Sequence, residues 1–234
     1  MKQLVSKITG KISLGVALLL TTGTLVQADT ISYTNSVSGV TDWTQALVFP
    51  QLDPSYTLTG VTIDLSATFS STFAITNIGG TTWGANSSAR RNLDIYLGSS
   101  PVDLAVDASN TNGPGSPWLS LLSSALNISN LAPGHNVSGT ETGSDGPNGA
   151  AYTDNTTLSY FLGNGTVSLD LFTESGFTMT IHNGNSYDSS ETTSATATGI
   201  VTYDYIVPEP SSVLFLGLGG LVFLFLGGFR KAKS

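Results

Sequence analysis

The chain has 234 residues, enough for one domain with a single buried core, and only 10% of them are charged. Its abundant Gly, Ser, Thr and Asn residues are typical of short strands joined by turns and disfavour long solvent-exposed helices. Because the chain contains no cysteine, a disulfide framework, a thiolate nucleophile and a cysteine-ligated zinc site are all excluded.

The formal net charge of −8 conceals a separation of basic and acidic residues along the chain. All 16 acidic residues lie between Asp29 and Glu209, together with only two basic residues, Arg90 and Arg91, so this span has a net charge of 2 − 16 = −14. A body this acidic is repelled by nucleic acid and by anionic lipid surfaces. We therefore expect no nucleic-acid partner.

The N-terminus predicts a secretory signal peptide over residues 1–28. A basic stretch is followed by an apolar stretch that ends near Val26, and then by Ala28. Small residues just before the cut fit a signal peptidase, so we expect cleavage between Ala28 and Asp29. The alternative is an uncleaved anchor helix, which residues 21–24 disfavour because their threonines and glycine leave the apolar run short for a full span.

Residues 29–206 predict a body of about nine half-buried strands. Apolar and polar residues alternate most clearly over residues 61–69 and 167–171. Similar runs between Gly, Pro, Asn and Ser clusters predict further strands at residues 31–37, 45–49, 73–78, 93–97, 102–106, 177–182 and 200–207. The pattern predicts an all-β fold, an antiparallel β-sandwich of jelly-roll or immunoglobulin-like type.

The segment at residues 42–63, near the start of the body, is expected to contain a rigid corner between Pro50 and Pro54. Pro50 and Pro54 restrict the backbone there, and Asp53 is placed for an Asx-type hydrogen bond into the turn. We expect three apolar side chains to pack beneath the corner: Trp43, Phe49 and Leu52.

The same segment resembles the choice-of-anchor E domain. The family's apolar-Pro-x-Phe-Asp-Pro-Ser stretch recurs within residues 47–55, with Leu52 in place of the usual phenylalanine, and leads into a Leu-Thr-x-Val-Thr strand at 58–62. Near the other end, residues 201–205 resemble the family's closing strand. The resemblance implies an exported domain that occurs with different anchoring tails, and it implies no biochemical activity.

Residues 118–128 are consistent with one short helix, because their leucines and an alanine approximate helical spacing, although serines and flanking prolines oppose it. Residues 111–117 and 139–149 are expected to be exposed loops. The absence of an internal repeat of fixed period disfavours a solenoid or a propeller.

The body offers no recognisable catalytic constellation. Its two histidines, His135 and His182, are expected at the surface, and no serine lies in a G-x-S-x-G elbow. The glutamates at positions 141, 174, 191 and 209 do not single out a pair for glycoside hydrolysis, and no glycine-rich phosphate loop opens a helix. We therefore expect no enzyme activity and no cofactor.

Two binding hypotheses remain for the body. Asp145, Asn148 and Asp154 crowd one region with oxygen ligands, but their spacing does not match an EF-hand, so a solvated acidic loop without a metal is preferred to a calcium site. Trp83 and Tyr187, each between small polar residues, are suited to stacking on sugar rings if they are exposed. Packing into the core or a turn is the preferred interpretation for both.

The C-terminus combines an apolar span with a basic end. Residues 213–229 are uncharged and apolar, and as a helix they would be about 25 Å long, which just spans a membrane. Arg230, Lys231 and Lys233 follow, and because positive charge resists translocation we expect the C-terminus in the cytoplasm and the body outside.

Pro208, Glu209 and Pro210 stand just before this span, where the prolines hold an extended backbone. The order of Pro-Glu-Pro, apolar span and basic end over residues 207–234 resembles the PEP-CTERM sorting signal of Gram-negative, exopolysaccharide-producing bacteria. The resemblance implies recognition and processing by the membrane enzyme exosortase. A permanent C-terminal anchor is the alternative.

These observations predict an exported, non-enzymatic structural or interaction protein. We expect it to be held transiently in the inner membrane, processed by exosortase, and retained at the cell surface or in an extracellular matrix such as a biofilm, with extracellular polysaccharide as a partner. The alternative is a carbohydrate-binding module with a defined sugar site.

Overall fold

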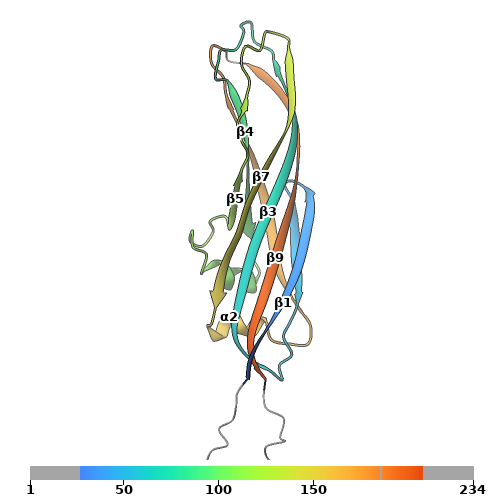
Figure 1. Ribbon diagram of the computed structural model, residues 1–234, viewed down its shortest axis with the longest axis vertical. Helices are drawn as coiled ribbons and strands as arrows, with labels where there is room; N and C mark the ends of the chain where they lie inside the picture. Colours follow the sequence, from blue (N-terminus) through green and yellow to red (C-terminus); the bar gives the residue numbers. More distant parts are fainter. Residues whose placement is uncertain (1–26, 185, 208–234) are drawn as a thin grey trace, which may run out of the picture. The chain divides into compact units, whose positions relative to one another are not determined.

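The computed structural model describes residues 27–184 and 186–207, of which Ala28–Ile206 form one compact unit. This unit consists of two antiparallel sheets, as expected for a β-sandwich (Figure 1). The all-β prediction is therefore confirmed. Most of the predicted signal peptide and the whole 213–229 span lie outside the described residues.

The first sheet, sheet A, has the strand order β1-β9-β3-β7. Its members are β1 (Gln27–Val40), β9 (Tyr187–Val207), β3 (Thr57–Asn77) and β7 (Asn136–Tyr152). In β3 the buried and exposed residues alternate over most of its 21 residues, which is the pattern of a strand with one face on a core and the other in water.

The second sheet, sheet B, has the strand order β2-β8-β4-β5, and a short strand, β6, also pairs with β4. Its members are β2 (Thr44–Pro50), β8 (Thr166–Thr180), β4 (Ser88–Leu97), β5 (Leu119–Leu122) and β6 (Leu126–Asn127). Two short helices complete the described part of the chain: α1 (Pro101–Asp107) and α2 (Asn155–Tyr160).

Several strands are longer than the sequence pattern predicted. The runs at 61–69 and 73–78 belong largely to one strand, β3, and most of the runs at 167–171 and 177–182 to another, β8. In β3 the intervening Ser71 keeps the inward orientation of its apolar neighbours and is fully buried. A polar residue at an inward position thus interrupts the apolar pattern of the sequence but continues the strand in space.

The predicted strand at 102–106 was wrong, because these residues lie in helix α1. Ser100 caps the helix, its side chain accepting the Asp103 N–H while the Asp103 carboxylate accepts the Ser100 N–H, and Pro101 occupies the first turn. This capping box and an N-terminal proline favour helix over strand.

The helix considered at 118–128 was also wrong. Trp118 is buried. In the strand that follows, Leu119 and Leu121 are buried whereas Ser120 and Leu122 are exposed, which is the alternation of a strand. Residues 126–127 pair with β4 as strand β6. Tertiary pairing with β4 thus overrides the approximate helical spacing.

Residues 139–149, predicted as a loop, form the middle of strand β7. Gly143 and Gly139 lie opposite Phe69 and Phe73 of β3, and a Cβ atom at either glycine would collide with the facing ring. The two glycines therefore leave room for the aromatic rings of the neighbouring strand. In the sequence, isolated glycines usually indicate turns.

The corner predicted before β3 is confirmed. The Ser55 N–H donates to Asp53 Oδ1 at 2.8 Å, and hydrogen bonds from Ser55 lower the pKa of Asp53. The three predicted side chains beneath the corner are buried: Trp43, Phe49 and Leu52.

The interior contains two apolar clusters. The larger cluster includes Ile63, Leu65 and Leu169, whereas the smaller one includes Phe73, Ile75 and Trp83. The two meet at a row of buried polar residues on sheet A, in which Thr193 of β9 and Glu141 of β7 both pair with Ser71 of β3. We call these three residues, together with Arg91 and Ser123 beside them, the polar row.

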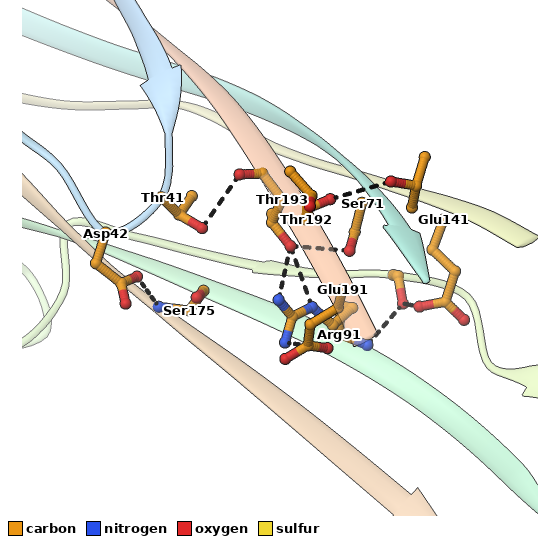
Figure 2. Close-up of polar contacts among 11 residues, drawn as sticks. Thr41, Asp42, Ser71, Arg91, Glu141, Ser175, Glu191, Thr192 and Thr193 are labelled. Atoms are coloured by element: carbon orange, nitrogen blue, oxygen red, sulfur yellow. Dashed lines mark hydrogen bonds and ion pairs between the residues drawn. The ribbon is translucent and has the colours of Figure 1, made fainter. Parts of the chain in front are cut away.

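Arg91 of β4 reaches across from sheet B into this row (Figure 2). Its Nη2 donates to Thr193 Oγ1 at 2.6 Å, and its Nη1 lies 3.0 Å from Glu191 Oε2. Thr193 Oγ1 in turn donates to Ser71 Oγ at 2.8 Å. Arg91 is only 4% exposed, so its charge is held by these partners and by the ring of Phe177, 5.8 Å from the guanidinium carbon.

Substitution of Gly143 by alanine tests the ring-admitting role of the β7 glycines. We expect Gly143→Ala to lower the free energy of unfolding by about 1–3 kcal/mol, because the added Cβ overlaps the Phe69 ring. Gly80 is the matched control, since a Cβ there meets nothing within 4 Å, and its alanine variant should unfold at the wild-type urea concentration or slightly above. Equal urea midpoints for the two variants would contradict the steric explanation.

Removal of the buried arginine tests the polar row. Arg91→Met should lower the free energy of unfolding by about 2–4 kcal/mol. The expected loss is smaller than for a fully buried ion pair, because the Glu191 side chain is 31% exposed and is solvated again when the arginine is removed. The neighbouring Arg90 is exposed, so Arg90→Met should change the stability by no more than about 0.5 kcal/mol. Chemical unfolding of both variants gives the comparison, and a small effect at Arg91 would show that the row is replaceable.

Candidate functional site

The outer face of sheet B carries a pair of partly exposed aromatic rings. Thr44 of β2 and Tyr96 of β4 are both register partners of Phe172 of β8, so the three form one cross-strand row. The rings of Tyr96 and Phe172 stack with their centroids 4.9 Å apart and an interplanar angle of 9°. Period-2 alternation turns both rings outward, because the flanking Leu97, Leu171 and Thr173 are buried.

Carboxylates surround this aromatic pair. Asp170 and Glu174 lie two residues before and after Phe172 on β8, and Asp94 of β4 is the register partner of Glu174. Partial burial raises the pKa of Tyr96, and the negative charges of Asp94 and Glu174 raise it further. The aromatic pair therefore lies within the electrostatic reach of these two carboxylates.

A groove of about 660 Å³ opens beside the pair. It runs between the start of β2, strand β8 and the segment that follows β4, and it is lined by Asp42, Thr44, Gly98, Ser99, Asp170, Phe172 and Glu174, with Trp43 and Thr173. We call these residues, with Tyr96 and Asp94 beside them, the sheet-B groove. Aromatic surface, hydroxyls and carboxylates thus converge on one open, largely polar concavity.

Hydrogen bonds around the groove fix the carboxylate of Asp42 and the backbone of Asp170. Asp42 Oδ1 accepts the Ser175 N–H at 2.7 Å (Figure 2), and the Gly98 N–H donates to the Asp170 carbonyl oxygen at 2.6 Å. The buried Asp103 of the α1 capping box accepts the Asp170 N–H at 3.2 Å. Burial raises the pKa of Asp103, and its hydrogen bonds with Ser100 and Asp170 oppose that rise.

The outer face of sheet A has a different chemistry. Two shallow hollows of about 450 and 200 Å³ lie over β7, β3 and β9. Small hydroxyl-bearing side chains make up most of the lining of both hollows. Thr68, Ser144 and Thr196 line both, and five further residues line one of the two: Ser66, Ser70, Thr142, Ser194 and Thr198. This face offers many hydrogen-bonding groups but little charge and no stacked aromatic pair, so it suits hydrated contact rather than selective binding.

The two aromatic residues considered for sugar contact fall in different environments. Trp83 is fully buried in the smaller apolar cluster, so the hypothesis of sugar contact by Trp83 was wrong, and the preferred core interpretation is confirmed. Tyr187 is 40% exposed and tilts against Phe177, 6.4 Å between ring centroids. Neither residue lines the sheet-B groove.

The sequence analysis did not identify Tyr96 and Phe172. Both occupy outward positions in strands with clear alternation, and that signal was present in the sequence. Their proximity depends on the pairing of β4 with β8, which are far apart along the chain, so only the register could reveal the site.

The other residues considered for chemistry lie apart. His135 and His182 are exposed, and the backbone of His135 belongs to a turn, as expected. Glu141 and Glu191 belong to the surroundings of Arg91 instead of the groove, and Glu141 Oε1 has no hydrogen-bond partner among the described residues. Glu174 alone of these glutamates lines the groove.

The three residues weighed for calcium have structural roles. Asp154 caps α2 by accepting the Thr157 N–H at 2.9 Å, and this hydrogen bond lowers the pKa of Asp154. Asp145 accepts the Ser120 N–H at 2.9 Å and lies 3.4 Å from Asn148 Nδ2. Over residues 27–184 and 186–207, no three His, Cys, Asp or Glu side chains form a group that could hold a metal ion.

The sorting residues Pro208, Glu209 and Pro210 lie outside the described part of the chain, as do the basic residues Arg230, Lys231 and Lys233. The predicted cleavage point between Ala28 and Asp29 falls at the first residues of β1. None of the helices within the described residues is long and apolar enough to cross a membrane.

Comparison with solved structures finds viral proteins. A structure of Mud crab tombus-like virus is 9% identical over 91% of this chain and 97% of its own, with a TM-score of 0.22. A structure of Desmodium yellow mottle tymovirus is 10% identical over 90% of this chain and 98% of its own, with a TM-score of 0.23. The infectious bursal disease virus VP2 subviral particle is 9% identical over 78% of this chain and 38% of its own, with a TM-score of 0.22. At these TM-scores the similarities carry no argument.

The chain has no match among curated proteins. Residues 207–231 match the PEP-CTERM protein-sorting motif, in agreement with the resemblance found in the sequence, whereas the resemblance to the choice-of-anchor E domain is not confirmed. The match identifies an exported protein that carries a C-terminal membrane-anchoring sorting signal of the kind that exosortases process.

Proposed function

We propose that this protein is delivered to the cell surface or the extracellular matrix by exosortase processing, and that its β-sandwich then contacts extracellular polysaccharide. The match of residues 207–231 to the PEP-CTERM protein-sorting motif carries the proposal. In this account residues 213–229 hold the chain in the inner membrane only until the exosortase acts near Pro208, Glu209 and Pro210, and the basic end of Arg230, Lys231 and Lys233 stays in the cytoplasm.

The geometry of the body supports display on such a tether. Hydroxyl pairs join β1 to β9, with Ser32 next to Thr202 and Ser36 next to Thr198, each 2.8 Å apart, so the two strands run antiparallel. β1 therefore begins and β9 ends at the same end of the sandwich (Figure 1). The opposite end and both outer faces are free to meet a matrix.

The body acts by binding and not by catalysis in this proposal. Its exposed histidines lie outside the sheet-B groove, and the hydroxyl-bearing face of sheet A suits hydrated contact with polysaccharide. The alternative, a carbohydrate-binding module with a defined sugar site, is favoured by a specific observation, the stacked rings of Tyr96 and Phe172 beside the groove.

Expression of the full-length protein with and without an exosortase tests the sorting step. We expect the mature mass to lack the C-terminal span only in the host that has the enzyme. Replacement of Pro208, Glu209 and Pro210 by alanine should abolish the difference, whereas Ser211→Ala should not, because serine lies outside the Pro-Glu-Pro segment. An intact C-terminal span in both hosts would refute exosortase processing.

A further inference from the structure

We propose that the sheet-B groove binds a protonated amino sugar, as found in a partly de-N-acetylated polysaccharide. This inference rests on the proposed contact with extracellular polysaccharide and names the site and the class of sugar. Three properties of the groove carry it: an aromatic platform, an uncompensated negative charge, and a suitable size.

The aromatic platform is the pair of Tyr96 and Phe172. Because the rings stack at 9° with centroids 4.9 Å apart, each covers one face of the other, and Phe172, which lines the groove, is left with one face and its edges for a ligand. The apolar C–H face of a pyranose ring packs well on such a surface, and a nearby cation gains further from the negative face of the rings. Outside the groove, Tyr187 is tilted against Phe177 at 60° and Tyr56 against Tyr205 at 52°, so neither pair is stacked.

The negative charge comes from Asp42, Asp94, Asp170 and Glu174. Asp94 and Glu174 are register partners on adjacent strands, an arrangement of like charges that destabilises a sheet. Each aspartate accepts a hydrogen bond from a neutral donor: Asp42 from the Ser175 N–H, Asp94 from Ser120 Oγ and Asp170 from Ser168 Oγ.

No cation in the described part of the chain balances these carboxylates. The salt bridge found there joins Arg91 to Glu191, inside the sandwich rather than at the groove. Arg90, the other described arginine, lies four residues from Asp94 along β4, about 13 Å at the usual rise per residue. The groove is therefore complementary to a ligand with positive charge, and it repels a uronate sugar.

The size of the groove also fits a sugar. Its volume of about 660 Å³ falls within the range of roughly 300–1,000 Å³ that is usual for small-molecule sites. Thr44 and Ser99 add hydroxyls to its rim, and sugar hydroxyls can donate to the four carboxylates. An ammonium group placed between Asp94 and Glu174 would relieve their repulsion while the sugar ring packs on Phe172, which Tyr96 holds in place by stacking.

Calorimetric titration of the mature exported protein tests the inference with three probes. These are a glucosamine oligomer at a pH where its amines are protonated, the same oligomer fully N-acetylated, and an oligomer of a uronic acid. We expect saturable binding of the protonated oligomer alone, weakened by added salt and lost when the pH is raised until the amines are neutral.

Variants locate the binding. Glu174→Gln and Asp94→Asn keep the shape of the groove, and each should weaken binding of the glucosamine oligomer by about tenfold or more, while Tyr96→Ala should remove the platform. Matched controls are Asp188→Asn and Tyr187→Ala, which change an exposed carboxylate and an exposed ring outside the groove and should bind like the wild type. Unfolding midpoints measured in parallel confirm that the variants are folded.

Each other outcome overturns the inference. Equal affinity for the N-acetylated oligomer would assign the groove to neutral sugars, and calcium that saturates the protein and blocks the oligomer would assign the carboxylates to a metal. Binding that survives Glu174→Gln, Asp94→Asn and Tyr96→Ala would place the site elsewhere. If no oligomer binds although the mature mass shows processing, this inference fails while exosortase sorting stands.

Discussion

The buried contact of Arg91 with Thr193 and Glu191 joins the two sheets at the point where the apolar core is interrupted. On either side of it the sheets are held by the side chains of one apolar cluster, whereas the polar row lies between the two clusters. A buried arginine must be compensated, and Glu191 and Thr193, which in turn donates to Ser71, supply the oxygen atoms that a continuous apolar interior would lack. At this level the two sheets are therefore joined by polar contacts: Arg91 binds Thr193 and Glu191, and Ser123, which follows β5, donates to Glu141.

Because the interior uses the inward faces of the strands, the outer faces are the sheet surfaces that remain for contact with a partner. These faces differ in a way that follows from their side chains. Sheet A presents short hydroxyl groups in flat array, whereas sheet B presents two stacked rings among carboxylates beside a groove. A hydroxyl array makes many weak, exchangeable contacts with a hydrated polymer, whereas aromatic rings and fixed charges select a ligand by its shape and by the sign of its charge. A matrix protein can use both, one for general retention and the other for recognition.

Sequence reasoning succeeded where a local signal decides the structure. The alternation around Ile63 and Leu169 identified strands, and Pro50, Asp53 and Pro54 identified a corner. It failed where a partner distant in the chain overrides the local signal. Gly143 suggests a loop until Phe69 is placed opposite it, and Leu121 suggests a helix until β4 pairs with its backbone. The capping box at Ser100 was a local signal that the apolar run at 102–106 concealed.

By itself the sequence identified the C-terminal sorting signal of an exported protein, because sorting signals are read by other proteins as short linear segments and need no tertiary structure. The order of Pro208, Glu209 and Pro210, the apolar span and the basic end was sufficient, and the motif match agrees. Only the tertiary structure decided which aromatic rings are available for binding. Trp83 lies between Thr82 and Gly84 and Tyr96 lies between Ile95 and Leu97, so local sequence favours exposure for Trp83 and burial for Tyr96. The sandwich instead buries Trp83 and pairs Tyr96 with Phe172, 76 residues away, because register sets which side chains share a face.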